Sequence, residues 1–358
     1  MYSLIDGFVH VDSLADPAAV EKLREQQKSL GVDRWCFAGS NFCRQLGVPD
    51  QNPIGLWLKS GHPDEVYLFA SAASFSEDEP RPSDPGQESY ERQVEALSEA
   101  GIDGWKLLNG KPDRARIPLN ADEYRALYEA LVKHRLPLRW HVGDPPEFWD
   151  PEQIPRWARP EWCYTSRQPK LEDLRRQAVD VLRAFPQLEV VFNHFFFLGG
   201  ELERAAELLE RHPNVHLDLT PGIEMYFAFS RNRELARRFF SKYSRRILLG
   251  SYSSPGRPPG PVVGMIRRFL ETQDSFDPPH GDPFMWPESR GPLQGLALEH
   301  RLLNDIYWNN WQRIAGKRPA RLNKRHVSAY LERWKGLDSG PDLAGQVSAL
   351  YSSRQAER

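Results

Sequence analysis

Short apolar runs alternate with longer segments of helical period along most of the chain. Eight runs predict strands, at 4–11, 34–38, 66–72, 104–108, 136–142, 188–195, 215–219 and 247–250. The segments between and after them predict helices around 17–30, 53–61, 87–100, 121–134, 170–185, 200–212, 231–243 and 261–272. Eight strand-helix pairs are typical of an α/β fold, the closed (β/α)8 TIM barrel. An open doubly wound sheet is the alternative, but no glycine-rich phosphate loop follows the first run.

Beyond the eighth helix the pattern changes. A proline-rich stretch at 277–292 precedes a helix patterned with Leu, Ile and Trp at about 298–315, which we expect to cover one end of the barrel. The remainder is a polar tail. We therefore predict a TIM barrel with its cap helix over residues 1–323 and a C-terminal helical extension or tail over residues 324–358.

Composition narrows the class of partner. The 358 residues carry a net charge of −2 and 40% hydrophobic residues, with no polybasic run, so we expect a small-molecule substrate, no nucleic acid and no membrane. The three cysteines lack CxxC spacing, which excludes a thiolate zinc site and favours a reducing, cytoplasmic location. The N-terminus enters a strand pattern at once, with no basic leader. The sequence does not decide between a monomer and a homodimer.

Three of the ten histidines fall at or beside the end of a predicted strand. These are His10, His141 and His194, on the first, fifth and sixth strands. Because the carboxyl ends of barrel strands meet at one face, three such placements indicate a shared site more than three separate structural histidines. Lys106 ends the fourth strand and would bring a positive charge there, or extend to solvent. The seven other histidines lie on predicted helices, turns or loops and are expected at the surface.

The segment after the fifth strand, 144–169, is unusually aromatic. Because loops after barrel strands form the pocket, we expect the part from Phe148 to Tyr164, with Trp149 in it, to pack over the mouth as a lid. A local hydrophobic cluster is the alternative. Asp144 opens this segment in an Asp-Pro-Pro sequence, where it could hold a histidine or a metal, or simply start a turn.

Several short motifs occur in a characteristic order: Ile5-Asp6-Gly7-Phe8-Val9-His10, Gly104-Trp105-Lys106-Leu107, Trp140-His141-Val142-Gly143-Asp144-Pro145, Phe192-Asn193-His194-Phe195, Asp218-Leu219-Thr220-Pro221, Ile247-Leu248-Leu249-Gly250-Ser251-Tyr252 and Trp308-Asn309-Asn310-Trp311-Gln312-Arg313-Ile314. Their order and spacing resemble the amidohydrolase superfamily, in its amidohydrolase-related branch of metal-dependent TIM barrels. The resemblance covers roughly residues 3–323.

Two departures from the family pattern bear on the metal. The resemblance implies His-x-His at the end of the first strand, where both imidazoles hold a metal, but the first position is Phe8. It implies a metal-binding aspartate after the eighth strand, but the residue is Tyr252. The family-type ligands that remain are His10 and His141, and two imidazoles hold zinc weakly. We therefore predict no cofactor and no metal, while weak zinc at His10 and His141, a three-histidine site with His194, and Tyr252 as an oxygen ligand stay open.

The predicted catalytic residues perform acid-base chemistry without a metal, as the lactonase-like branches of the superfamily do. They are His10, His141, His194, Tyr252, Lys106 and Glu224. Glu224 follows the seventh strand as a carboxylate base, or as an acid near a helix N-terminus. The predicted substrate-binding residues are Phe8, Trp140, Asp144, Trp149 and Phe195.

Three functions remain in competition. The first is a hydrolase or lyase that acts on a small carboxylate-bearing or aromatic substrate with little or no metal. The second is a non-catalytic pseudoenzyme that binds a small molecule. The third is a mononuclear zinc hydrolase or decarboxylase with atypical ligands, and Phe8 and Tyr252 count against it. The histidines and the lysine at strand ends favour the first, because a bare scaffold does not need them there.

Overall fold

The computed structural model describes residues 2–11, 17–43, 48–72, 88–222, 224–282 and 291–332. Eight parallel strands form one sheet in the order β1-β2-β5-β6-β7-β8-β9-β10. They are β1 (Leu4–Val9), β2 (Val32–Ala38), β5 (Val66–Ala70), β6 (Gly104–Gly110), β7 (Leu138–Val142), β8 (Val190–Phe192), β9 (Val215–Asp218) and β10 (Ile247–Leu248). Each falls within or overlaps a predicted run, so the strand prediction is confirmed.

The sheet closes between its first and last strands. Gly7 donates its backbone N–H to the carbonyl of Leu249 (3.0 Å), and Tyr252 donates to the carbonyl of Phe8 (2.8 Å). The Asp6 carboxylate lies across the same seam and accepts hydrogen bonds from the backbone N–H (2.9 Å) and hydroxyl (2.5 Å) of Ser251. These contacts complete the TIM barrel and exclude the open sheet.

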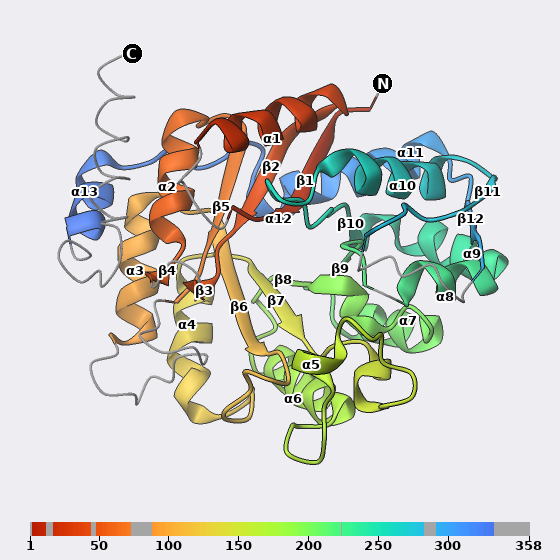
Figure 1. The fold of residues 1–358 in the computed structure, drawn as a ribbon. Helices are drawn as coiled ribbons and strands as arrows, with labels where there is room; N and C mark the ends of the chain where they lie inside the picture. The colour runs from red at the N-terminus through yellow and green to blue at the C-terminus, as the bar shows by residue number, and fades with distance from the viewer. Residues whose placement is uncertain are drawn as a thin grey trace.

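The predicted helices surround the strands (Figure 1). They are α1 (Pro17–Ser29), α2 (Asn52–Gly61), α3 (Tyr90–Ala100), α4 (Arg125–Lys133), α6 (Leu171–Ala184), α7 (Leu202–Arg211), α9 (Arg233–Tyr243) and α10 (Pro259–Glu271). The sequence pattern did not predict the short helices α5 (Arg159–Trp162) and α8 (Met225–Arg231), or the hairpins β3 (Asn41–Cys43) with β4 (Val48–Asp50) and β11 (Ser275–Phe276) with β12 (Leu293–Gln294). No described helix is long and apolar enough to cross a membrane.

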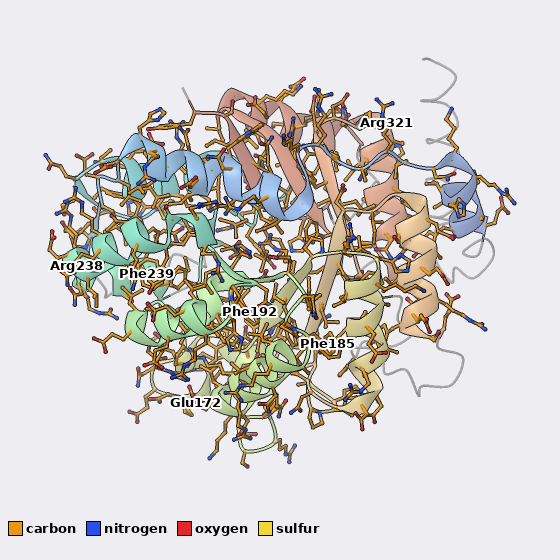
Figure 2. The ribbon with its side chains drawn as sticks, turned by 180° about the vertical axis from the view of Figure 1, so that it is seen from behind. Glu172, Phe185, Phe192, Arg238, Phe239 and Arg321 are labelled. Carbon is orange, nitrogen blue, oxygen red and sulfur yellow. The ribbon has the colours of Figure 1, made fainter. Side chains whose placement is uncertain are left out.

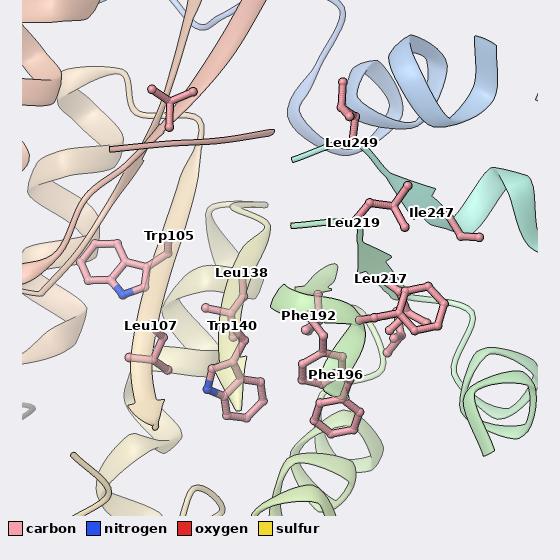
Figure 3. Close-up of a cluster of buried hydrophobic side chains, with 14 of the residues drawn as sticks. Trp105, Leu107, Leu138, Trp140, Phe192, Phe196, Leu217, Leu219, Ile247 and Leu249 are labelled. Atoms are coloured by element: carbon pink, nitrogen blue, oxygen red, sulfur yellow. The ribbon is translucent and has the colours of Figure 1, made fainter. Parts of the chain in front are cut away.

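The main core lies between the barrel and its helices. Successive side chains of a strand point to opposite faces, so alternate residues such as Trp105 and Leu107 of β6 face the helices (Figure 3). Trp140 of β7 stacks on Phe192 of β8, with ring centroids 5.8 Å apart. Seen from behind, Phe192 lies inside this layer, whereas Glu172 and Arg238 extend from outer helices (Figure 2). This alternation leaves the intervening side chains to fill the barrel.

The predicted cap helix covers the amino-terminal end of the barrel. It consists of α11 (His300–Asn304), a π-helical turn (Asp305–Asn309) and α12 (Asn310–Ala315). The buried ring of Trp311 packs with Ile5 and Leu248 inside the barrel and donates to the carbonyl of Leu249 (3.0 Å). A side chain on Gly7 would put its Cβ 1.9 Å from Trp311, so only glycine fits there. Trp311 and the cap helix thus close the amino-terminal end of the barrel, and the carboxyl end is left open for a cavity.

The last described helix, α13 (Lys324–Glu332), lies against α3 at the barrel wall (Figure 1). Val327 and Tyr330 are buried, and the Asn52 side chain donates to the Tyr330 hydroxyl (2.9 Å). The predicted division at residue 323 stays a prediction, because the tail over 333–358 lies outside the described residues.

Candidate functional site

A cavity of about 280 Å³ opens at the carboxyl ends of the strands. It brings together seven of the predicted site residues from five segments of the chain. They are Phe8, His10, Lys106, His141, Asp144, His194 and Tyr252. Phe148 and Trp162 of the aromatic segment also line it, which agrees with the predicted lid. The lid also has a small core of its own, in which Phe148, Ile154, Ala158 and Tyr164 are buried together.

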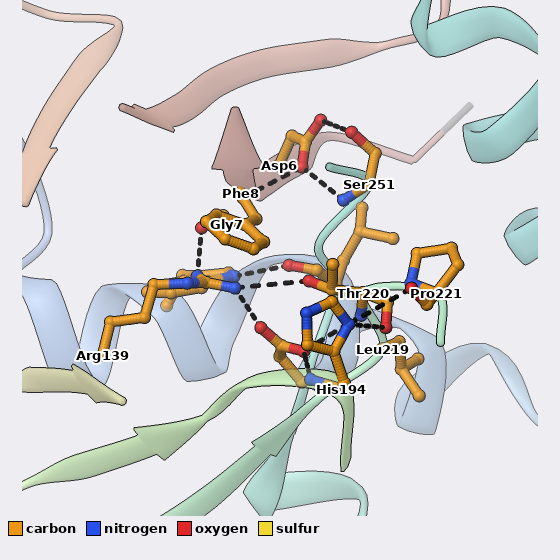
Figure 4. Close-up of polar contacts among 12 residues, drawn as sticks. Asp6, Gly7, Phe8, Arg139, His194, Leu219, Thr220, Pro221 and Ser251 are labelled. Atoms are coloured by element: carbon orange, nitrogen blue, oxygen red, sulfur yellow. Dashed lines mark hydrogen bonds and ion pairs between the residues drawn. The ribbon is translucent and has the colours of Figure 1, made fainter. Parts of the chain in front are cut away.

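Two cations flank the ring of Phe8 at the floor of the cavity. The Lys106 ammonium lies 4.8 Å from the ring centroid, and the guanidinium carbon of Arg139 lies 4.0 Å from it. Arg139 is fully buried inside the barrel and donates to Asp218, to Thr220 (3.3 Å) and to the carbonyl of Gly7 (Figure 4). The aromatic face therefore stabilises positive charge at this level of the barrel.

His10 packs against Phe8 and Tyr252, with ring centroids 4.7 and 4.9 Å apart. Removal of the ring from bulk water, and then the charges of Lys106 and Arg139, lower its pKa from 6.5 to about 3. A hydrogen bond with the backbone of Ala38 acts in the opposite direction. The imidazole is therefore neutral at physiological pH.

His141 forms a dyad with Asp144. Its Nε2 lies 3.1 Å from Oδ1 of the carboxylate, and both residues are buried. Burial alone would raise the pKa of Asp144, but the charge of Lys111 and hydrogen bonds from His141 and Tyr164 hold it well below its usual value. Burial also lowers the pKa of His141. An ionised carboxylate only accepts, so Nε2 carries the proton and Nδ1 has a free lone pair.

His194 begins a left-handed turn that continues through Phe197. The φ angles of these four residues lie between 52° and 58°, a conformation that costs about 1–2 kcal/mol for each non-glycine residue. Asp218 accepts the backbone N–H of His194 (2.8 Å), and Arg175 donates to the carbonyl of Phe197 (2.6 Å). These contacts offset the strain, and strain of this kind concentrates at functional sites.

The left-handed turn also fixes the orientation of the His194 ring. Its Nδ1 lies 3.2 Å from each of the carbonyl oxygens of Thr220 and Pro221 (Figure 4). Carbonyls only accept, so Nδ1 carries the proton and Nε2 has the lone pair. Burial, followed by the charges of His141 and Lys106, lowers the pKa of His194 well below 6.5. The rings of His141 and His194 have centroids 5.1 Å apart.

Four predicted site residues do not line the cavity. Trp140 points outward because it alternates with the inward-pointing His141, and its indole donates to Asn109 (2.8 Å). Trp149 packs on Tyr164 inside the lid. Phe195 faces Phe229 and Phe240 because of the left-handed backbone. The buried carboxylate of Glu224 lies behind Gly222, whose Cβ would sit 2.9 Å from it.

The sequence interpretation missed several residues of the site. Arg139 precedes His141 by two positions, so the strand period alone would have placed both in the barrel. Lys111 and Arg114 line the cavity, but they come from the loop after β6, whose course the sequence does not reveal. The expectation that the remaining histidines lie at the surface is wrong for two of them. His212 and His216 are buried, and His216 contacts Glu189 (3.0 Å).

A family model described as amidohydrolase matches residues 80–310, well over half of the chain. The chain belongs to the amidohydrolase family. No curated protein matches the chain significantly in sequence.

Several solved structures resemble this chain in fold. One is an uncharacterised TIM-barrel protein from Bordetella bronchiseptica, with a TM-score of 0.56 and 13% identity over 88% of this chain and 99% of the other. Another is 5-carboxyvanillate decarboxylase from Sphingomonas paucimobilis, with a TM-score of 0.53 and 15% identity over 88% and 99%. A third is a probable 2-pyrone-4,6-dicarboxylic acid hydrolase from Acinetobacter baumannii with citric acid bound, with a TM-score of 0.52 and 12% identity over 88% and 100%.

The side chains of this protein do not suit the metal that the family implies. Phe8 and Tyr252 occupy two of the implied ligand positions, and their rings pack 5.1 Å apart. The Lys106 ammonium lies 4.8 Å from the centre of the Phe8 ring and would repel a divalent cation bound there. Among the described residues, no three His, Cys, Asp or Glu side chains are grouped as a metal site requires.

Proposed function

We propose that this amidohydrolase-family protein is an enzyme that acts on a small carboxylate-bearing, planar molecule by histidine acid-base chemistry, without dependence on a metal. One observation carries the proposal: His141 and His194 line one cavity, each with a hydrogen bond that leaves the other ring nitrogen unprotonated. Two neutral imidazoles beside a lysine supply a base, which acts as the acid once it has taken a proton, and a positive charge.

The cavity suits an anion with a flat body. Lys106 at the floor and Arg114 in the wall bring positive charge to a substrate carboxylate, whereas Lys111 is paired with Asp144. Phe148, Trp162 and Phe197 offer aromatic faces to a planar group. The names of two structures with this fold, 5-carboxyvanillate decarboxylase and 2-pyrone-4,6-dicarboxylic acid hydrolase, also describe small carboxylates. This agreement supports the proposed class of substrate.

We favour hydrolysis as the reaction. Nδ1 of His141 removes a proton from water, and the water oxygen attacks the carbonyl carbon of the substrate. The electron pair of the carbonyl bond moves to its oxygen, where the Lys106 ammonium stabilises the negative charge. The carbonyl double bond then re-forms and the bond to the leaving group breaks, while the leaving group takes the proton that His141 returns. If Tyr252 donates this proton instead, the tyrosinate recovers a proton from His141. Nε2 of His194 holds the substrate by accepting a hydrogen bond.

A lyase would use the same residues without adding water to the product. The two reactions are distinguished by carrying out turnover in ¹⁸O-labelled water and weighing the product by mass spectrometry. Label in the product supports hydrolysis. Turnover without label, with release of carbon dioxide, would replace hydrolysis by decarboxylation.

The experiment incubates chelator-dialysed protein with a panel of aromatic and unsaturated carboxylic acids and their lactones and amides. We expect turnover to survive chelation, and His141→Gln and His194→Asn to reduce kcat at least about 100-fold. Asparagine is chosen at 194 because it tolerates the left-handed backbone. His326→Ala, on α13, is the matched control. Loss of activity with the chelator and recovery with zinc would establish the zinc hydrolase instead, and binding without turnover would establish the pseudoenzyme.

A further inference from the structure

The carboxylate of Asp144 is held by side chains from three separate parts of the chain. Oδ1 contacts Nε2 of His141 (3.1 Å), on β7. Oδ2 accepts hydrogen bonds from Lys111 (3.0 Å), which follows β6, and from the hydroxyl of Tyr164, which belongs to the lid. The Lys111 ammonium also donates to the Tyr164 hydroxyl (3.2 Å). Asp144 and Tyr164 are both 4% exposed, so water does not replace these contacts.

The sequence around Asp144 explains why distant donors are needed. An aspartate at a turn usually accepts hydrogen bonds from the backbone N–H groups of the next two residues. Here those residues are Pro145 and Pro146, and proline has no N–H. The carboxylate therefore depends on His141, Lys111 and Tyr164 for its orientation.

The core of the lid fixes the position of the Tyr164 hydroxyl. The backbone N–H of Tyr164 donates to the carbonyl of Phe148 (2.8 Å). Its ring packs on Trp149 and Phe148, with centroids 4.9 and 6.2 Å away. The hydroxyl reaches Asp144 only while the lid lies over the cavity, so the seating of the lid and the orientation of the carboxylate belong to one arrangement.

We propose that Tyr164 is a positioning residue, whose hydroxyl orients Asp144 so that His141 keeps its proton on Nε2 and presents Nδ1 to the substrate. This inference rests on the proposed function for its catalytic meaning. If the Tyr164 hydroxyl is removed, the carboxylate retains Lys111 but can rotate away from His141. The ring then exchanges between its two neutral tautomers, and only one of them leaves Nδ1 free to accept a proton.

The test compares Tyr164→Phe with the native protein by two-bond ¹H–¹⁵N correlation spectra of histidine-labelled protein, which distinguish the two neutral tautomers. His141→Gln identifies the signal of His141. We expect a single Nε2–H tautomer in the native protein and a mixture in Tyr164→Phe. Trp157→Phe is the control, because it alters the same lid core without touching Asp144. A His141 tautomer unchanged in Tyr164→Phe would overturn the inference.

Kinetics and a direct signal complete the test. With a substrate found by the panel, Tyr164→Phe should lower kcat at least about tenfold and change KM less than about twofold, because binding groups remain. Should Tyr164→Phe fail to fold, the native protein decides: its spectrum should contain a strongly downfield Tyr164 hydroxyl proton that Asp144→Asn removes, and absence of that signal refutes the contact. If the His141 tautomer shifts in Tyr164→Phe but neither the native protein nor any variant shows turnover, only the proposed function is refuted. If the native protein shows turnover but the tautomer is unchanged in Tyr164→Phe, only the inference about Tyr164 is refuted.

Discussion

Replacing Phe8 by histidine would restore the paired imidazoles that the family resemblance implies at the end of β1. We nevertheless expect that Phe8→His alone will not create a zinc site. The Lys106 ammonium lies 4.8 Å from the centre of the Phe8 ring, which the imidazole would replace, so a metal on that imidazole would lie close to this charge. A divalent ion at that distance from one positive charge is opposed by about 7 kcal/mol at an effective dielectric constant of about 20. The positive charge, and not just the missing ligand, disfavours a metal.

Removal of the Lys106 charge should therefore raise the affinity for zinc more than the added imidazole does. If water screens the repulsion to about 3 kcal/mol, affinity for zinc still changes by about 100-fold. We expect Phe8→His/Lys106→Met to bind zinc at least that much more tightly than Phe8→His. The assay is a competition titration with a chromogenic chelator on protein first stripped of metal, with thermal unfolding as a check that each variant is folded.

The matched control is Phe8→His/Lys133→Met. Lys133 lies on α4 with its side chain 58% exposed, so its removal makes the same change in net charge far from the cavity. It should leave zinc affinity as it is in Phe8→His. Equal affinities in Phe8→His and Phe8→His/Lys106→Met would refute the reasoning, because the missing imidazole would then be the whole barrier.

Two further predictions concern stability. The folded chain keeps His10 neutral down to a pKa of about 3, whereas the unfolded chain protonates it below 6.5. This group therefore leaves the free energy of unfolding unchanged above about pH 7 and lowers it by about 2 kcal/mol at pH 5. Urea unfolding at both pH values measures the fall, and an equal fall in His10→Gln would assign it to other groups. Gly7→Ala should lower the free energy of unfolding by about 3 kcal/mol through its clash with Trp311. Gly264→Ala should not lower it, because a Cβ at Gly264 has no neighbouring atom within 4 Å. Equal losses of unfolding free energy in the two variants would show that Trp311 moves aside.

The barrel was predictable from sequence because its strands are buried and regularly spaced. Their apolar runs record contact with the helix layer, as Trp105 and Leu107 show on β6. The ends of strands were equally informative, since the carboxyl ends of all barrel strands meet at one face. His10, Lys106 and His141 could therefore be assigned to one cavity without knowledge of any contact between them.

The errors in the site arose where local geometry decides direction. Trp140 follows Arg139 and precedes His141, so the strand alternation should have assigned it to the outer face. Phe195 could not have been placed in this way. It lies in a left-handed turn, where neither the period of a strand nor that of a helix applies. The energetic cost of that turn is offset by Asp218, 24 positions from its partner His194, and by Arg175, 22 positions from its partner Phe197.

The charges around the cavity bear on the kind of ligand that it would bind. His10 and His194 remain neutral when folded, so at neutral pH they contribute no charge to the cavity. The negative charge of Asp144 is matched by Lys111, and that of Asp218 by Arg139. The ammonium of Lys106 also lies at the floor of the cavity, 4.8 Å from the centre of the Phe8 ring. A side-chain cation at the floor can neutralise a substrate carboxylate, which is the task that a metal ion performs in other enzymes. It does so while the imidazoles of His141 and His194 keep the lone pairs that proton transfer requires.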